Sequence, residues 1–177
     1  SVMRLLLLGQ TSPASATPRR QWPAITLESL LYLIILGLAL LTRFWDLGSR
    51  TLHHDESLHA YFSWLLATGQ NYTHDPLMHG PFLFHFNALI YALFGASDVT
   101  TRFSSAIFGV ILVMQPVMLR GDRQLGRWGA LTASTLLLLS PVFLYQARYI
   151  RHDSFTVVGA LLLFTAIVRY VERPSRG

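Results

Sequence analysis

The amino-acid sequence predicts an all-α integral membrane protein with about four transmembrane helices and two interfacial amphipathic helices in its first outer loop. Of its 177 residues, 52% are hydrophobic and 13% are charged, about half the charged fraction of an ordinary soluble domain. Several apolar segments are long enough to cross a bilayer. All fourteen basic residues are arginines, and many lie at the ends of apolar segments, where they act as topology signals.

The composition also excludes some kinds of site. The chain contains no cysteine, so it cannot form disulfides, thiol nucleophiles or zinc sites built from thiolates. A net charge of +5 in a soluble protein would suggest nucleic-acid binding. Here the arginines are expected to set the membrane topology instead. We therefore expect membrane lipid, and no nucleic acid, as a partner.

The first predicted transmembrane helix covers residues 23–45. At 1.5 Å per residue it is long enough to cross a hydrocarbon core of about 30 Å. Trp22 and Trp45 flank it, as aromatic residues do at membrane interfaces. Glu28 lies in its first turn, where the positive end of the helix dipole stabilises a carboxylate.

Three further spans are predicted at residues 102–119, 128–147 and 154–171, each bordered by arginines. Pro141 lies inside the second of these and is expected to kink it near its end. The chain thus divides into a polar N-terminal arm, residues 1–21, and a single transmembrane domain, residues 22–177.

The loop after the first span is predicted to hold two interfacial helices, at residues 55–69 and 81–95. Apolar residues in the first helix recur at the spacing of an amphipathic helix; they are Leu58, Tyr61, Phe62, Leu65 and Leu66. Gly69 is expected to end this helix. The second segment is apolar but short for a full crossing, and His85 and Asn87 interrupt it. It is therefore expected to lie in the interface.

Arginine-rich connections should share the cytoplasmic side of the membrane. If residues 81–95 stay on the outer surface, the N-terminal arm, the loop at 120–127 and the C-terminal tail all fall on that side. If they crossed the membrane, the loop would move outside and the termini would lie on opposite sides. We therefore predict a multi-pass protein of the cell inner (plasma) membrane with both termini in the cytoplasm.

This topology gathers ionisable residues on the outer side, including all seven histidines. The candidate catalytic residues are Asp55 and Glu56 in "HHDESLHAY" and Asp153 in "RYIRHDS". Asp55 and Asp153 can serve as helix caps, with Glu56 favoured in a first helical turn. A carboxylate there can also act as a general base when burial and neighbouring charges tune its pKa. For Asp55 the two roles are compatible.

Two arginines close to Asp153, Arg148 and Arg151, are candidate phosphate-binding residues, because a guanidinium group matches the oxygens of phosphate. The phosphate could belong to bulk lipid or to a substrate. His74 and His79 in "YTHDPLMHGP" are further candidates for binding a substrate or its phosphate.

The segment around His74 and His79 can also be a rigid turn set by its proline and glycine residues. Another alternative is a divalent metal held by His54, His74 and His79. Their spacing matches no strong metal motif, so the sequence predicts no cofactor with certainty.

Three segments, "HHDESLHAYFSWLL", "YTHDPLMHGPFLF" and "ARYIRHDSFTV", together resemble a known family. They are similar to the N-terminal module of the GT-C superfamily of lipid-linked-sugar-dependent glycosyltransferases. Within it they most resemble the dolichyl-phosphate-mannose protein mannosyltransferase and aminoarabinose transferase branch. The resemblance extends over residues 43–172.

The resemblance implies transfer of a sugar from a polyprenyl-phosphate carrier to an acceptor on the extracytoplasmic face. It implies that Asp55 is the catalytic base, with Glu56 as its neighbour in the motif and Asp153 as the later acidic position. The alternative is a non-catalytic transmembrane subunit of this fold that scaffolds a larger complex with other membrane subunits.

Overall fold

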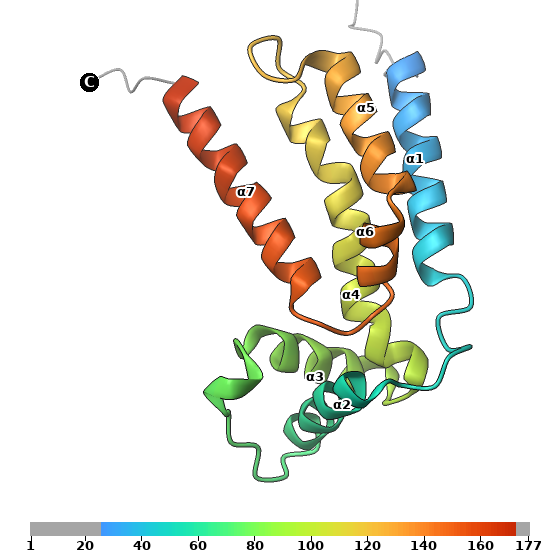
Figure 1. Ribbon diagram of the computed structural model, residues 1–177, viewed down its shortest axis with the longest axis vertical. Coiled ribbons are helices and arrows are strands. Elements are labelled where there is room, and N and C mark those ends of the chain that lie inside the picture. Colours follow the sequence, from blue (N-terminus) through green and yellow to red (C-terminus); the bar gives the residue numbers. More distant parts are fainter. Residues whose placement is uncertain (1–25, 173–177) are drawn as a thin grey trace, which may run out of the picture.

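The computed structural model describes residues 26–172, and the predicted arm at residues 1–21 lies outside this range. The described chain is helical, without strands (Figure 1). In chain order its helices are α1 (Leu27–Phe44), α2 (His54–Ala67), the 3-10 helix η1 (Pro76–Met78), α3 (Phe82–Phe94), α4 (Asp98–Met114), the 3-10 helix η2 (Gln115–Leu119), α5 (Gly126–Leu139), α6 (Pro141–Gln146) and α7 (Asp153–Glu172). The predicted all-α membrane fold is confirmed.

Three helical segments are long and apolar enough to cross a membrane: Leu27–Phe44, Asp98–Leu119 and Asp153–Glu172. They run alongside one another in one bundle (Figure 1). The protein buries 61% of the apolar window of the middle segment, against 22% and 17% for the other two. The α4–η2 segment is therefore the centre of the bundle, and α1 and α7 present most of their surface to lipid.

The α4 helix begins earlier than the predicted boundary at residue 102. Ser97 caps it, accepting a hydrogen bond from the backbone N–H of Thr100, whose hydroxyl accepts one from the Ser97 N–H. This reciprocal cap satisfies two backbone donors. It also places Arg102 in the second turn of the helix, where the guanidinium is buried.

The single span predicted at residues 128–147 needs correction, because the structure divides it into α5 and α6. α5 ends at Leu139, Ser140 has an extended ψ of 118°, and α6 begins at Pro141. Proline cannot continue a helix here, since it has no N–H and its ring clashes with the preceding turn. α6 follows α5 along the bundle, so together they carry the chain from one end to the other (Figure 1).

The predicted interfacial helices are α2 and α3, which pack together and lie across one end of the bundle (Figure 1). Gly69, with φ +69°, follows the C-cap of α2. Its N–H donates to the Leu66 carbonyl, and the Gln70 N–H donates to that of Leu65. This pattern is a Schellman motif, which favours glycine at the left-handed position.

The opposite end of the bundle holds the start of α1, the turn between η2 and α5, and the end of α7 (Figure 1). Glu28 lies 2.7 Å from Arg127 and 3.7 Å from Arg120 there. These ion pairs hold the arginine-rich turn against the start of α1. The two ends of the described chain lie at this same end of the bundle (Figure 1).

Polar side chains also link helices inside the bundle. Arg43 is fully buried, and its Nη2 donates to the Leu137 carbonyl on α5. Gln115 donates to the Val158 carbonyl on α7. Bonds of this kind to neighbouring helices stabilise polar groups within a bilayer, although Nε of Arg43 and Oε1 of Gln115 are buried without a partner among the described residues. These bonds link α1 to α5 and η2 to α7.

Candidate active site

A buried ion pair joins the interfacial helix α2 to α4 of the bundle. The Nε of Arg102 donates to Oε1 of Glu56 at 2.9 Å, and its Nη2 donates to Oε2 at 2.8 Å. Both side chains are almost completely buried. The remaining guanidinium donors bind the carbonyls of Leu47, Arg50 and Thr51. Arg102 thereby uses all five of its N–H groups.

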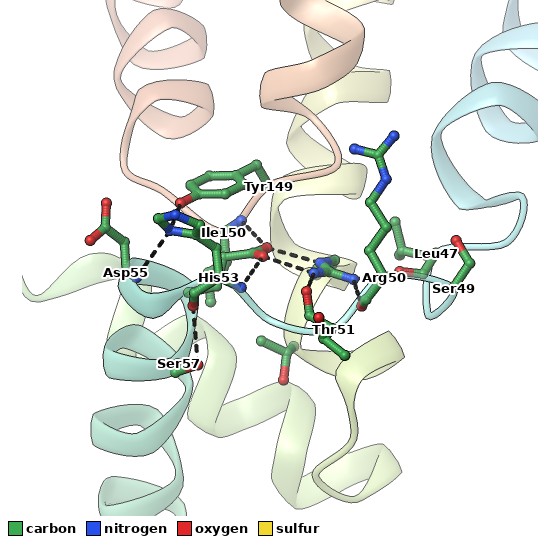
Figure 2. Close-up of polar contacts among 12 residues, drawn as sticks. Leu47, Ser49, Arg50, Thr51, His53, Asp55, Ser57, Tyr149 and Ile150 are labelled. Carbon is green, nitrogen blue, oxygen red and sulfur yellow. Dashed lines mark hydrogen bonds and ion pairs between the residues drawn. The ribbon is translucent and has the colours of Figure 1, made fainter.

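Glu56 has backbone partners as well (Figure 2). The N–H of His53 donates to Oε2 at 3.0 Å, and the N–H of Ile150 donates to Oε1 at 3.2 Å. Burial alone would raise the pKa of Glu56, but the hydrogen bonds from Arg102 and the two backbone groups outweigh it and lower the pKa. A carboxylate held in this way is a poor base, because its oxygens are already occupied.

His53, rather than Asp55, caps α2, which corrects the expected cap. The Nδ1 of His53 accepts from the N–H of Asp55 at 3.4 Å and lies 2.9 Å from the hydroxyl of Tyr149. Asp55 sits two residues into the helix behind this cap.

The Asp55 side chain is partly exposed. Figure 2 shows it pointing away from the hydrogen-bonded cluster, and its carboxylate has no hydrogen-bond or ion-pair partner among residues 26–172. The backbone of Asp55 is nevertheless held, because its carbonyl lies 2.6 Å from Nδ1 of His59. Of the two neighbouring acidic residues, Asp55 is thus the one free to exchange a proton.

A cavity of about 1040 Å³ opens beside the start of α2. It lies between the 47–54 segment, α6 and the loop before α7, and its polar lining includes Arg50, His53, His54, Glu56, Arg102, Arg148 and Tyr149. Arg50 makes no ion pair with the described residues, and its side chain extends away from the loop contacts (Figure 2).

The predicted phosphate-binding residue Arg148 lines this cavity but is already engaged. Its guanidinium donates to the carbonyls of Thr42, Trp45 and Asp46, at 2.9, 2.7 and 3.1 Å. Those carbonyls lie at the C-terminal end of α1, where a cation is favourable for the helix dipole. Arg148 therefore anchors α1.

A second cavity, of about 630 Å³, lies on the other side of the loop before α7. Its polar lining holds Arg151, Asp153, His79 and His152. Arg151 lies 3.5 Å from Asp153, and both side chains are about half exposed. Asp153 is the first residue of α7. The cap position expected for Asp153 is occupied by His152, whose carbonyl accepts a hydrogen bond from the Thr156 N–H.

Three histidine rings connect α2 with this second cavity. The His152 ring centroid lies 5.3 Å from that of His59 and 5.2 Å from that of His79. His59 also stacks on Phe84 at 5.7 Å. Burial lowers the pKa of both His59 and His152. These two rings are therefore held in the neutral form. Asp55 is absent from the lining of both cavities, although its neighbours His53, His54 and Glu56 line the larger one.

His79 has an unusual backbone, with φ +67° and ψ −157°. Side-chain-bearing residues rarely adopt this region, which costs of order 1–3 kcal/mol and is otherwise reserved for glycine. His74 lies apart from it, 3.1 Å from the hydroxyl of Tyr72. His54 lines the other cavity. The candidate metal ligands are thus not brought together, and residues 26–172 contain no group of three or more His, Asp or Glu that could hold a metal.

Arg102 and Arg50 were not predicted as site residues. Arg102 lies at the start of an apolar run, where an arginine is typical of a membrane boundary. Its long-range partner Glu56 cannot be recognised from spacing. Arg50 could have been found by its position in the motif segment, three residues before His53.

Comparison with known families gives a match over more than half of the chain. The model of the dolichyl-phosphate-mannose-protein mannosyltransferase family matches residues 78–177. This range includes Arg102, His152 and Asp153, and it begins after Asp55 and Glu56. No curated protein and no solved structure matches the chain.

Proposed function

The chain belongs to the dolichyl-phosphate-mannose-protein mannosyltransferase family, GT-C glycosyltransferases that use a lipid-linked sugar, and we propose that it transfers the sugar of a polyprenyl-phosphate carrier to an acceptor hydroxyl at the extracytoplasmic face. In this proposal Asp55 is the catalytic base. The protein is a multi-pass protein of the inner membrane with both termini in the cytoplasm, so that α2 and α3 face outward.

The observation that carries the proposal is the contrast between Asp55 and Glu56. Glu56 is buried and bonded to Arg102, which fixes the start of α2. Asp55 projects from the same turn, and its carboxylate has no partner among the described residues. A base needs a rigid support and a free oxygen, and this turn provides both. We therefore assign Glu56 and Arg102 a positioning role.

In the proposed reaction, the acceptor oxygen attacks the anomeric carbon of the donor sugar and forms the new glycosidic bond. The bond from that carbon to the phosphate oxygen breaks, and its electron pair leaves with the phosphate. Asp55 takes the acceptor proton. The displacement inverts the configuration at the anomeric carbon. The larger cavity is roomy enough for the sugar and the acceptor group, and the side chains of Arg50 and His54 in its lining can form hydrogen bonds with hydroxyls.

Asp55→Asn tests this proposal, because the amide keeps the shape of the carboxylate but cannot accept the proton. We expect transfer from the lipid donor in membranes to fall by about 10²–10⁴-fold, the usual contribution of a general base. Asp98→Asn is the matched control, since Asp98 is an exposed carboxylate in the first turn of α4.

Unchanged transfer in Asp55→Asn would remove Asp55 from the mechanism. If the unaltered chain transfers no sugar and purifies only with other membrane proteins, the scaffold alternative is favoured instead.

A further inference from the structure

The α2 helix exposes large side chains on the face opposite its buried polar residues. The buried residues are Glu56, His59 and Ser63. On the other face, 37% of Leu58, 54% of Tyr61 and 38% of Trp64 is accessible to solvent. Members of each set are three or four residues apart, so each set forms one face of the helix. An exposed face that gathers large apolar and aromatic side chains is typical of an interaction surface.

This exposed face points away from the rest of the protein. On the buried face, Glu56 binds Arg102 on α4, and the ring of His59 stacks on that of Phe84 on α3. The exposed face lies opposite these contacts. α2 also lies further from the long helices than α3 does (Figure 1). The side chains of Tyr61 and Trp64 are therefore turned towards the water outside the membrane.

A hollow of about 270 Å³ lies along this face, between α2, the end of α3 and the start of α4. Tyr61, Trp64 and Tyr91 line it. The ring centroids of Tyr61 and Trp64 are 6.3 Å apart, and the ring planes are 25° from parallel. The two rings thus form one nearly continuous aromatic platform. None of the residues that line the hollow belongs to either of the two larger cavities.

Hydrogen bonds fix the wall of the hollow opposite the platform. The hydroxyl of Tyr91 lies 2.6 Å from Oγ1 of Thr101, and Thr101 donates to the Ser97 carbonyl at 2.7 Å. The side chains of Tyr91 and Thr101 are buried. The hollow therefore stands on rigid helix ends, which favours a preformed binding site.

An exposed platform of this kind is complementary to a carbohydrate. The faces of a sugar ring carry C–H groups, which pack on the negative faces of aromatic rings. The hydroxyls at the edge of the sugar ring can bond to the hydroxyl of Tyr61 and the indole N–H of Trp64. A purely apolar ligand would leave these two polar groups without partners, which is unfavourable.

We infer that the exposed face of α2 binds a carbohydrate chain, with its sugar rings stacked on Tyr61 and Trp64. The inference goes beyond the proposed function, because this site requires neither the lipid-linked donor nor the base. At 1.5 Å per residue, a chain held on the platform lies roughly 9–14 Å along α2 from Asp55.

Titration of the purified full chain with tetrasaccharides tests the inference. The probes are mannotetraose, cellotetraose and chitotetraose, and isothermal titration calorimetry measures their binding. Nanodiscs of phosphatidylglycerol and phosphatidylethanolamine hold the protein, so that no glycoside detergent competes. We expect at least one tetrasaccharide to bind, and glycerol, which has hydroxyls but no ring, to show no binding.

Alanine variants locate the binding. Tyr61→Ala and Trp64→Ala should each weaken it about tenfold, the upper end of what an aromatic contact contributes. Trp128→Ala is the matched control, because Trp128 is a 70% exposed tryptophan near the start of α5. It should bind as the unaltered chain does. All three variants should keep their melting temperature, since the side chains removed are exposed.

Two conservative variants separate stacking from general apolar contact. Trp64→Phe keeps an aromatic face and should retain most of the affinity, whereas Trp64→Leu should lose it. The inference is overturned if no tetrasaccharide binds, or if Trp64→Leu binds as tightly as the unaltered chain. Tighter binding of tetramethylammonium than of every tetrasaccharide would also overturn it, since the aromatic rings would then form a cation site.

A membrane anchor is the remaining alternative, because tyrosine and tryptophan are common at membrane interfaces. In a variant with Trp64 as its sole tryptophan, brominated lipids should leave the fluorescence unchanged, and the bound tetrasaccharide should alter it. Quenching by brominated lipids would overturn the inference. Asp55→Asn should bind the tetrasaccharide normally, so loss of transfer in that variant and loss of binding in Trp64→Ala test the two proposals separately.

Discussion

The pair of Glu56 and Arg102 holds together segments that are distant in the sequence. The two residues are 46 positions apart, and their shared contacts reach the 47–51 loop, the start of α2 and the loop before α7. Desolvating two charges is costly, and such a pair is stable only when nearly all its hydrogen-bonding groups are satisfied. Here the site depends on this pair for its geometry.

We expect Arg102→Ala to lower the free energy of unfolding by about 3–5 kcal/mol, because Glu56 would remain buried without a cation. SDS-induced unfolding in mixed micelles measures this change. Arg127→Ala is the control, since it removes an exposed partner of Glu28 and such pairs contribute roughly 0–1 kcal/mol. Equal losses in the two variants would contradict the structural role of the buried pair.

His59 and His152 predict how the stability of the protein depends on pH. The pKa of His59 and that of His152 are lowered in the folded protein. The unfolded chain therefore takes up protons at the ordinary histidine pKa of about 6.5, before the folded protein does. The contribution of these two histidines to the free energy of unfolding is fully present above that pH. It is lost as the pH decreases from there towards the lower pKa values of the folded protein.

Melting temperatures measured across this pH range check the expectation. His59→Phe should make the pH dependence shallower, because phenylalanine can still stack on Phe84 but cannot be protonated. An unchanged slope would show that His59 does not contribute.

At the scale of helices, the sequence predicted most elements from local patterns. The ends of α3 agree with its predicted range within one residue, because Pro81 precedes the apolar run and Gly95, with φ +78°, follows it. The sequence predicts one helix with a kink at Pro141, whereas the structure has two separate helices, α5 and α6. The apolar run continues through Pro141, but the helical pattern of backbone hydrogen bonds is interrupted there. Composition alone therefore could not separate the two helices.

Close packing between α4 and the end of α6 depends on Gly109. A side chain there would collide with that of Ala147 and approach its backbone at 3.4 Å. We expect Gly109→Ala to destabilise the protein by about 1–3 kcal/mol, because a packed backbone must move. Gly37→Ala, where there is open space, should be neutral or stabilising. Thermal unfolding of both variants in detergent measures the difference, and a neutral Gly109→Ala would exclude tight packing at this contact.

At the scale of the whole molecule, the bundle has two chemically different ends. One end holds Glu28 with Arg120 and Arg127. The other end holds α2 and α3 (Figure 1), with the polar linings of both cavities and the rings of His59, His79 and His152. Arginine-rich connections favour the cytoplasm, which is the basis for the proposed orientation with the cavities outside.

The chain has no natural cysteine, so single introduced cysteines report its orientation directly. We expect Gln70→Cys, after α2, to react with a membrane-impermeant thiol reagent in intact cells. Asp122→Cys, in the turn between η2 and α5, should react only after the membrane is permeabilised. Labelling of Asp122→Cys from outside would reverse the proposed orientation.

The sequence by itself determined the class of the protein, the position of nearly every helix and the gathering of the histidines at one end of the bundle. Apolar length, helical spacing, capping residues and arginine placement are local properties, so one segment at a time is sufficient to recognise them. The tertiary structure decided that Glu56 is bound by Arg102, that Arg148 anchors α1, and that Arg148 and Arg151 line different cavities. These outcomes depend on contacts between residues far apart in the chain, because a buried charge takes whichever partner the packed helices bring to it.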